Sequence, residues 1–181
     1  NEVESTLAQA VVIVVIVIAG AWAMWNRKPS AAPLSDRDTM VVADFTNTTG
    51  EPVFDGALKV ALAVALEQSP FLKVFPDERV RDTLRLMERR PDEPITREVA
   101  REIAQREQLT ALVAGSIGKL GTHYVLTLEA VNAQSGDTIG REQAEVAGRE
   151  DVLGALGAAA ARLRTTLGES LASEIGRASC R

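Results

Sequence analysis

The chain has 181 residues, of which 46% are hydrophobic, 4% aromatic and 25% charged, and its net charge is −5 at pH 7. An acidic balance without a clustered Lys/Arg face argues against a nucleic-acid partner, because phosphate binding needs such a face. The only cysteine is Cys180, so no disulfide can form within the chain. The length allows one membrane helix and one globular domain of ordinary size.

An uncharged apolar run over residues 7–25 contains eight consecutive Val and Ile residues. At about 1.5 Å per residue, a helix of this length crosses a hydrocarbon layer of about 30 Å. Trp22 and Trp25 stand where an interfacial aromatic belt is expected, and Arg27 and Lys28 follow in the headgroup zone. The run therefore predicts a single transmembrane helix with the lipid bilayer as its partner. A buried core segment and a signal peptide are the weaker alternatives.

The segments around this helix differ in composition. Residues 1–6 do not begin with Met, and we expect them to be the end of a longer upstream region. Residues 26–38 contain Pro and Ser and predict a juxtamembrane linker. Residues 39–173 carry the pattern of one globular domain. Residues 174–181 resemble the translation of a sequencing adapter, with a genuine basic tail ending near a reactive Cys180 as the alternative.

The amino-terminal half of the globular domain predicts two strands and a helix between them. A nearly continuous apolar run over residues 40–45 is typical of a central strand that is covered on both faces. Residues 44–52 are rich in turn formers, and residues 71–75 predict a second strand. The helix between them has apolar residues at helical spacing, namely Phe54, Leu58, Ala61, Leu62, Ala65 and Leu66.

The second half predicts two helices, three strands and a last helix. Asp77 and Thr96 are expected to cap the first two helices. Strands are expected near residues 111–117, 124–130 and 138–146 as an antiparallel meander with the last strand at an edge. The final helix opens at Asp151, with Val152, Leu156, Ala160, Leu163, Leu167 and Leu171 along one side. The order β-α-β-α-α-β-β-β-α predicts an α/β fold, a mixed-sheet sandwich.

Three glycines, Gly115, Gly118 and Gly121, are spaced three residues apart. A phosphate-binding loop needs its glycines between a strand and a helix, whereas these lie between two strands. We therefore expect a bulged or sharply bent hairpin there.

Five segments carry a resemblance to a known family. Residues 39–50, 66–72, 77–87, 115–117 and 167–173 resemble the region after the transmembrane helix in large bacterial serine/threonine protein kinases with tetratricopeptide (TPR) repeats. The domain is also similar to the amino-terminal domain of TolB and to the CsgG type. The resemblance implies a single-pass protein of the bacterial inner membrane with this domain outside the cytoplasm.

The local charge count points the other way, because basic residues after the apolar run favour a cytoplasmic carboxyl side. Large domains, however, translocate largely regardless of such charges, so the resemblance decides the predicted orientation. Similar domains also follow winged-helix transcription regulators or nucleotide cyclases, and these stay as alternatives for the missing upstream region.

The sequence offers no catalytic residue, no metal site and no cofactor loop. The kinase motifs, a Gly-rich loop with a strand Lys, His-Arg-Asp and Asp-Phe-Gly, do not occur. His123 is the only histidine, and we expect it to be a partly exposed strand residue. The fragment is therefore predicted to be a non-catalytic sensor or a module that binds protein partners. A small enzyme using the carboxylates of Asp44, Glu51 or Asp55 is the alternative.

The turn between the first strand and the first helix is the candidate binding site. In α/β sheets ligands often bind beyond the carboxyl ends of the strands, where helices begin with unpaired N–H groups. The candidate residues for a small polar ligand or a partner loop are Asp44, Thr46, Asn47, Thr48, Thr49 and Gly50. The structural alternative is that Asp44 and Asn47 cap backbone N–H groups while Gly50 adopts a positive φ.

Overall fold

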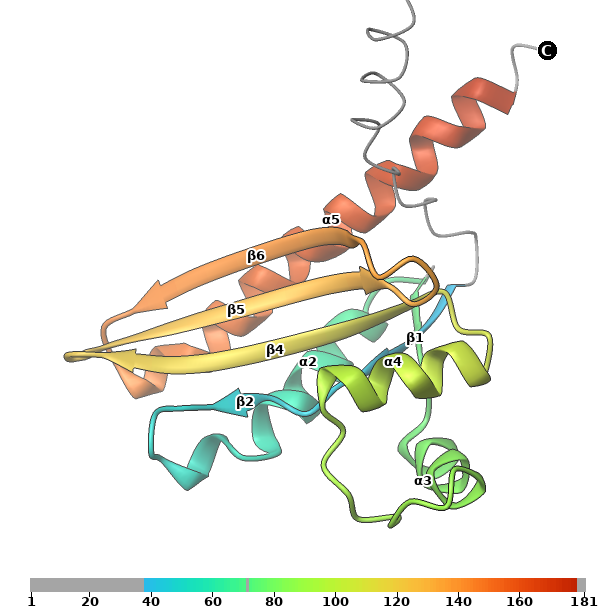
Figure 1. The fold of residues 1–181 in the computed structure, drawn as a ribbon. Helices are drawn as coiled ribbons and strands as arrows, with labels where there is room; N and C mark the ends of the chain where they lie inside the picture. Colours follow the sequence, from blue (N-terminus) through green and yellow to red (C-terminus); the bar gives the residue numbers. More distant parts are fainter. Residues whose placement is uncertain (1–37, 71, 179–181) are drawn as a thin grey trace, which may run out of the picture. The chain divides into compact units, whose positions relative to one another are not determined.

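The computed structural model describes residues 38–70 and 72–178, with side chains as far as Gly168 (Figure 1). The predicted transmembrane helix at 7–25, residues 1–6 and nearly all of the 26–38 linker lie outside the described residues. Within residues 38–70 and 72–178, no helix is long and apolar enough to cross a membrane.

The strands form one mixed sheet in the order β3-β1-β4-β5-β6, with short β2 paired to β4. β1 is parallel to both β3 and β4, and β4, β5 and β6 are antiparallel neighbours. The mixed sheet confirms the predicted α/β class, and β2 is an addition to the predicted order. The strand bounds are β1 Asp38–Val42, β2 Thr46–Asn47, β3 Leu72–Val74, β4 Ala111–Leu120, β5 His123–Asn132 and β6 Thr138–Val146.

Helices cover both faces of this sheet, and their bounds are η1 Pro52–Phe54, α2 Ala57–Glu67, α3 Asp77–Leu86, α4 Arg97–Arg106, η2 Arg149–Asp151 and α5 Val152–Ala178. α2 and α5 pack on one face, and α3 and α4 pack on the other (Figure 1). Met40 and Val42 of β1 join the first core, whereas Val41 joins the second. This confirms the predicted strand that is covered on both faces.

The end of the β4–β6 meander that contains the turn between β4 and β5 extends beyond α4 (Figure 1). On the sheet face that carries α3 and α4, Ser116 and Thr127 are half-buried and Gln143 is exposed. β6 is an edge strand, as predicted. Among the described residues, only the opposite face of β6 is packed under a helix, α5. The antiparallel part of the sheet therefore presents polar side chains and one free strand edge to solvent.

Three local predictions need correction. The first helix is interrupted, because Gly56 adopts a φ of +74° between η1 and α2. Asp77 is the first residue of α3, and Pro76 occupies the cap position instead. Thr96 does cap α4 as predicted, because its side chain accepts a hydrogen bond from the Val99 N–H. Gly115 lies within a regular strand instead of at a bulge, and the register irregularity falls at Ala130/Val131.

Gly115 is glycine because an aromatic ring occupies the space of its side chain. A Cβ at this position would lie 2.4 Å from Cζ of Phe45. The ring belongs to the residue before β2 and reaches the core beneath β4. The turn predicted around Gly121 is present, and its φ of +63° explains that glycine.

Candidate functional site

The loop from β1 to α2 is fixed to the sheet as a short strand. Thr46 and Asn47 pair in parallel with Ser116 and Ile117 of β4. The Thr48 N–H then donates to the Ile117 carbonyl at 2.9 Å, and its hydroxyl donates to the same oxygen at 3.2 Å. The hydroxyl of Thr48 is thereby used in holding the loop against β4.

Asn47 organises the rest of the loop with both ends of its amide. Its Oδ1 accepts hydrogen bonds from the Thr49 N–H at 3.0 Å and the Thr49 hydroxyl at 2.7 Å. Its Nδ2 donates to the Glu51 carbonyl at 3.0 Å and to Asp55 Oδ1 at 2.7 Å. Gly50 has a φ of +77° in the turn that these bonds close. These contacts are the turn chemistry of the structural alternative.

Asp44 acts at a different place from the other five candidates. Its Oδ2 accepts a hydrogen bond from the Ile95 N–H at 2.7 Å, and its Oδ1 lies 2.8 Å from Lys59 Nζ. It therefore joins the start of the loop to α2 and to the segment before α4. Ligand binding by Asp44, Thr46, Asn47, Thr48, Thr49 and Gly50 stays a prediction, and five of the six already have side-chain or turn roles within the fold.

Replacing Asn47 by Ala separates the two interpretations. Loss of its four hydrogen bonds should lower the free energy of unfolding by about 0.5–2 kcal/mol, the range for lost capping residues. Urea unfolding measures this effect, with Gln134→Ala as a control in another exposed turn. Unchanged stability together with lost signalling or partner binding would favour the ligand interpretation instead.

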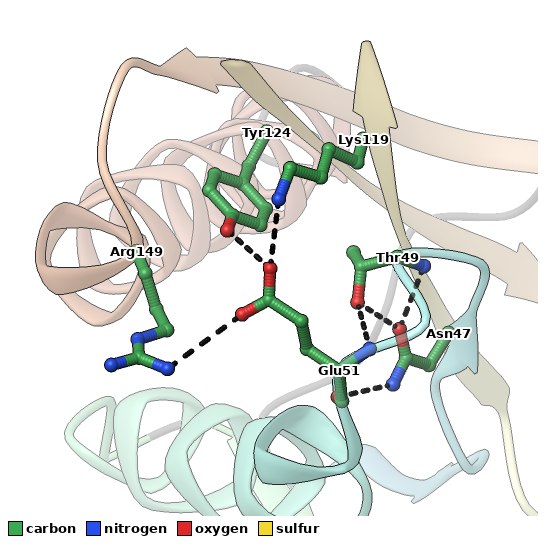
Figure 2. A network of polar contacts seen from close by, with 6 residues as sticks. All are labelled: Asn47, Thr49, Glu51, Lys119, Tyr124 and Arg149. Atoms are coloured by element: carbon green, nitrogen blue, oxygen red, sulfur yellow. Dashed lines mark hydrogen bonds and ion pairs between the residues drawn. The ribbon is translucent and has the colours of Figure 1, made fainter. Parts of the chain in front are cut away.

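Glu51 is the centre of a polar cluster that the sequence did not predict (Figure 2). Its Oε1 accepts hydrogen bonds from the Tyr124 hydroxyl at 2.5 Å and from Lys119 Nζ at 3.1 Å. Its Oε2 lies 3.9 Å from a guanidinium nitrogen of Arg149. The Tyr124 and then the Lys119 hydrogen bonds hold the pKa of Glu51 below its usual value. We call these four residues the Glu51 cluster.

The lowered pKa bears on the enzyme alternative. A carboxyl group that acts as a general acid near neutral pH needs a raised pKa. Glu51 shifts in the opposite direction, and the Asp44 and Asp55 carboxylates are engaged by Lys59 and Asn47. The geometry is that of a structural connection between the loop, the β4–β5 hairpin and η2.

An apolar groove with a volume of about 400 Å³ adjoins this cluster. We call it the Phe54 groove; it is lined by Val53, Phe54, Ala57, Leu58, Arg149, Glu150 and Leu153. Phe54 packs edge-on against Tyr124 with ring centroids 5.6 Å apart, so the groove and the Glu51 cluster share a wall. Val53 and Leu153 remain 57% and 58% exposed on separate elements.

Within the described residues, no group of three or more His, Cys, Asp or Glu side chains could hold a metal ion. His123 is exposed at the start of β5, where its Nδ1 lies 2.9 Å from Glu145 Oε1.

No protein-family model and no curated protein sequence matches this chain. Solved structures share its fold at low sequence identity. The C-terminal domain of LpoB from Escherichia coli is 17% identical with a TM-score of 0.56, covering 68% of this chain and 93% of that one. The corresponding domain from Salmonella enterica is 15% identical with a TM-score of 0.55, covering 70% and 90%.

Lipoprotein GNA1162 from Neisseria meningitidis is 16% identical with a TM-score of 0.52, covering 71% of this chain and 96% of that one. The three structures confirm the α/β architecture of the domain. At these identities the likeness concerns the fold alone.

Proposed function

We propose that this domain is a non-catalytic, partner-binding module of a bacterial membrane signalling protein. The apolar run at 7–25 would anchor it in the inner membrane as a single-pass protein, with the globular domain outside the cytoplasm. The resemblance to kinases with TPR repeats supports a signalling role and a downstream repeat region. One structure of the same fold is a lipoprotein, which supports membrane association for the fold.

The observation that carries the proposal is the Phe54 groove. Exposed large apolar side chains on a soluble surface are ordinary when they stand singly. Here Val53 of η1 and Leu153 of α5 flank one apolar cavity, although the chain separates them widely. A partner protein would insert an apolar side chain between them, and Arg149 and Glu150 would provide a polar rim. A small polar ligand at the β1–α2 loop is the accompanying sensor proposal.

Photo-cross-linking in intact cells tests this function. A photoreactive phenylalanine analogue replaces Val53 or Leu153 in turn, and Leu86 serves as the control because it is 73% exposed on α3, outside the groove. Both groove positions should give a protein adduct of the same mass, and position 86 should not. The adduct should stay in the membrane pellet after alkaline carbonate extraction and should be digested when protease is added to intact spheroplasts.

Equal adducts at position 86 and at the groove, or none at the groove, would contradict partner binding at this surface. Adducts that wash off the membrane would contradict the anchor, and adducts protected until the membrane is lysed would place the domain in the cytoplasm. Ala57→Asp places a charge in the groove and should reduce the adduct at both groove positions.

A further inference from the structure

The outer edge of β6 is a free strand edge with an internally symmetric charge pattern. Among residues 38–70 and 72–178, β6 is the last strand of the sheet and pairs on one side only, with β5. Arg141, Gln143 and Glu145 lie on the same face, opposite Glu129, Thr127 and Val125 of β5. The Arg141 and Glu145 side chains are 61% and 59% exposed. Opposite charges therefore stand at equal distances on either side of Gln143.

The direction of the backbone groups of β6 follows from the hydrogen bonds of β5. The Ala133 N–H donates to the backbone carbonyl of Thr110, just before β4. The Asn132 N–H donates instead to the backbone carbonyl of Asp137, just before β6. Because backbone groups alternate along a strand, odd-numbered residues of β5 face β4, and Thr127 is one of them. Its partner Gln143 is then in a pair without hydrogen bonds to β5, so the Gln143 N–H and C=O point outward.

Arg141 and Glu145 share this outward orientation, since each lies two residues from Gln143. The three residues thus combine unpaired backbone groups at the edge with alternating charge on one face. Such an edge is a template for one more strand.

We propose that β6 pairs antiparallel with β6 of a second copy of this chain, about a two-fold axis at Gln143. Gln143 then faces the partner's Gln143 in a hydrogen-bonded pair, and their side-chain amides can bond to each other. Arg141 stands opposite the partner's Glu145, and Glu145 opposite the partner's Arg141. The inference rests on β6 alone and is independent of the proposed membrane anchor and groove.

The charges select this register from the others that the backbone allows. Pairing about Arg141 or about Glu145 would set like charges directly opposite each other, which is destabilising. Pairing about Glu142 would set that residue against its own copy. Only the Gln143 axis places both opposite-charge pairs in register. Edge charges of one sign block pairing, but this arrangement is self-complementary.

Arg141 is already held in a suitable position. Its guanidinium lies 2.7 Å from Glu129 Oε1, and Glu129 also pairs with Arg97 at 2.7 Å. The partner's Glu145 would approach Arg141 from the open side and extend this ionic row across the interface. On the same face, the row Thr46–Ser116–Thr127–Gln143 crosses β2, β4, β5 and β6. In the dimer, this polar row would continue into the partner's Gln143.

Disulfide trapping tests the axis. Gln143→Cys, in the full chain with Cys180→Ser, should form a cross-linked dimer under mild oxidation, because a hydrogen-bonded antiparallel pair has Cα atoms about 5.5 Å apart. Thr127→Cys in the same background is the matched control in the same row of the sheet. Its copies would be separated by three strand spacings, about 14 Å, beyond the roughly 7 Å that a disulfide can span. Equal cross-linking of the two variants, or none at position 143, would overturn the proposal.

Charge exchange tests the register. Glu145→Arg should weaken dimerisation of the full chain in detergent by about 2- to 30-fold, because two favourable cross-strand pairs become unfavourable. Arg141→Glu also sets a second carboxylate beside Glu129 within each chain, so the variant that carries both substitutions is compared with Arg141→Glu alone. Opposite charges across the axis are restored only in the double variant, which should dimerise more tightly than Arg141→Glu in sedimentation equilibrium. Dimerisation that is unchanged by Glu145→Arg, or a double variant that dimerises no more tightly than Arg141→Glu while both keep their circular dichroism, would rule out the Gln143 axis.

Discussion

Replacing Phe54 by Ala should lower the free energy of unfolding by about 3–5 kcal/mol, the usual range for a buried Phe. Phe54 is 5% exposed, belongs to the core between the sheet, α2 and α5, and packs edge-on against Tyr124. Its loss leaves a cavity where η1 meets β5. Urea unfolding of the full chain in detergent, followed by far-ultraviolet circular dichroism, measures the change.

The neighbouring residue is a matched control for this effect. Val53 is 57% exposed on the same short helix, so Val53→Ala should change stability by no more than about 0.5 kcal/mol. A cost below about 1 kcal/mol for Phe54→Ala would mean that η1 does not pack on the sheet as described. The Phe54 groove would then lose its wall.

Ile103→Ala should cost about 2–5 kcal/mol from the opposite face of the sheet. Ile103 is fully buried in the core that joins α3 and α4 to β1 and β4. Its loss leaves a cavity under α4 that the rigid strands cannot fill. The same urea titration measures it, with Leu86→Ala as a control because Leu86 is 73% exposed on α3.

The two core substitutions should act independently. Phe54 and Ile103 belong to separate cores divided by the sheet. Distant sites without shared partners add within about 0.3–0.5 kcal/mol. A double variant whose cost departs from the sum by more than about 1 kcal/mol would indicate that the sheet transmits strain between the two cores.

The Glu51 cluster holds the wall of the Phe54 groove in place. Glu51 lies just before η1, and its bonds to Tyr124 and Lys119 fix the start of that helix to the β4–β5 hairpin. Phe54 then reaches the Tyr124 ring, and Val53 is left at the rim of the groove. The surface proposed for partner binding thus depends on contacts between segments that are distant in the sequence.

The sequence by itself determined the longer helices and strands and their order, because burial periodicity and turn chemistry are local signals, but it did not predict β2 or the break between η1 and α2. The apolar run at residues 40–45 predicted a strand covered on both faces, and Val41 and Val42 do enter different cores. Thr96 was recognisable as a cap because capping needs only a hydroxyl and an N–H three residues later. The edge position of β6 followed from its polar composition.

Only the tertiary structure decided which distant residues meet. Glu51, Lys119 and Tyr124 carry no spacing signal, since a loop and two strands bring them together. Gly115 looked like a bend, yet it is glycine because the Phe45 ring fills the space beneath β4. Asp44 looked like part of one site with Asn47, yet it bonds Ile95 and Lys59 instead. Local patterns do not contain such contacts, because they depend on strand pairing and on which side chains the packed sheet brings face to face.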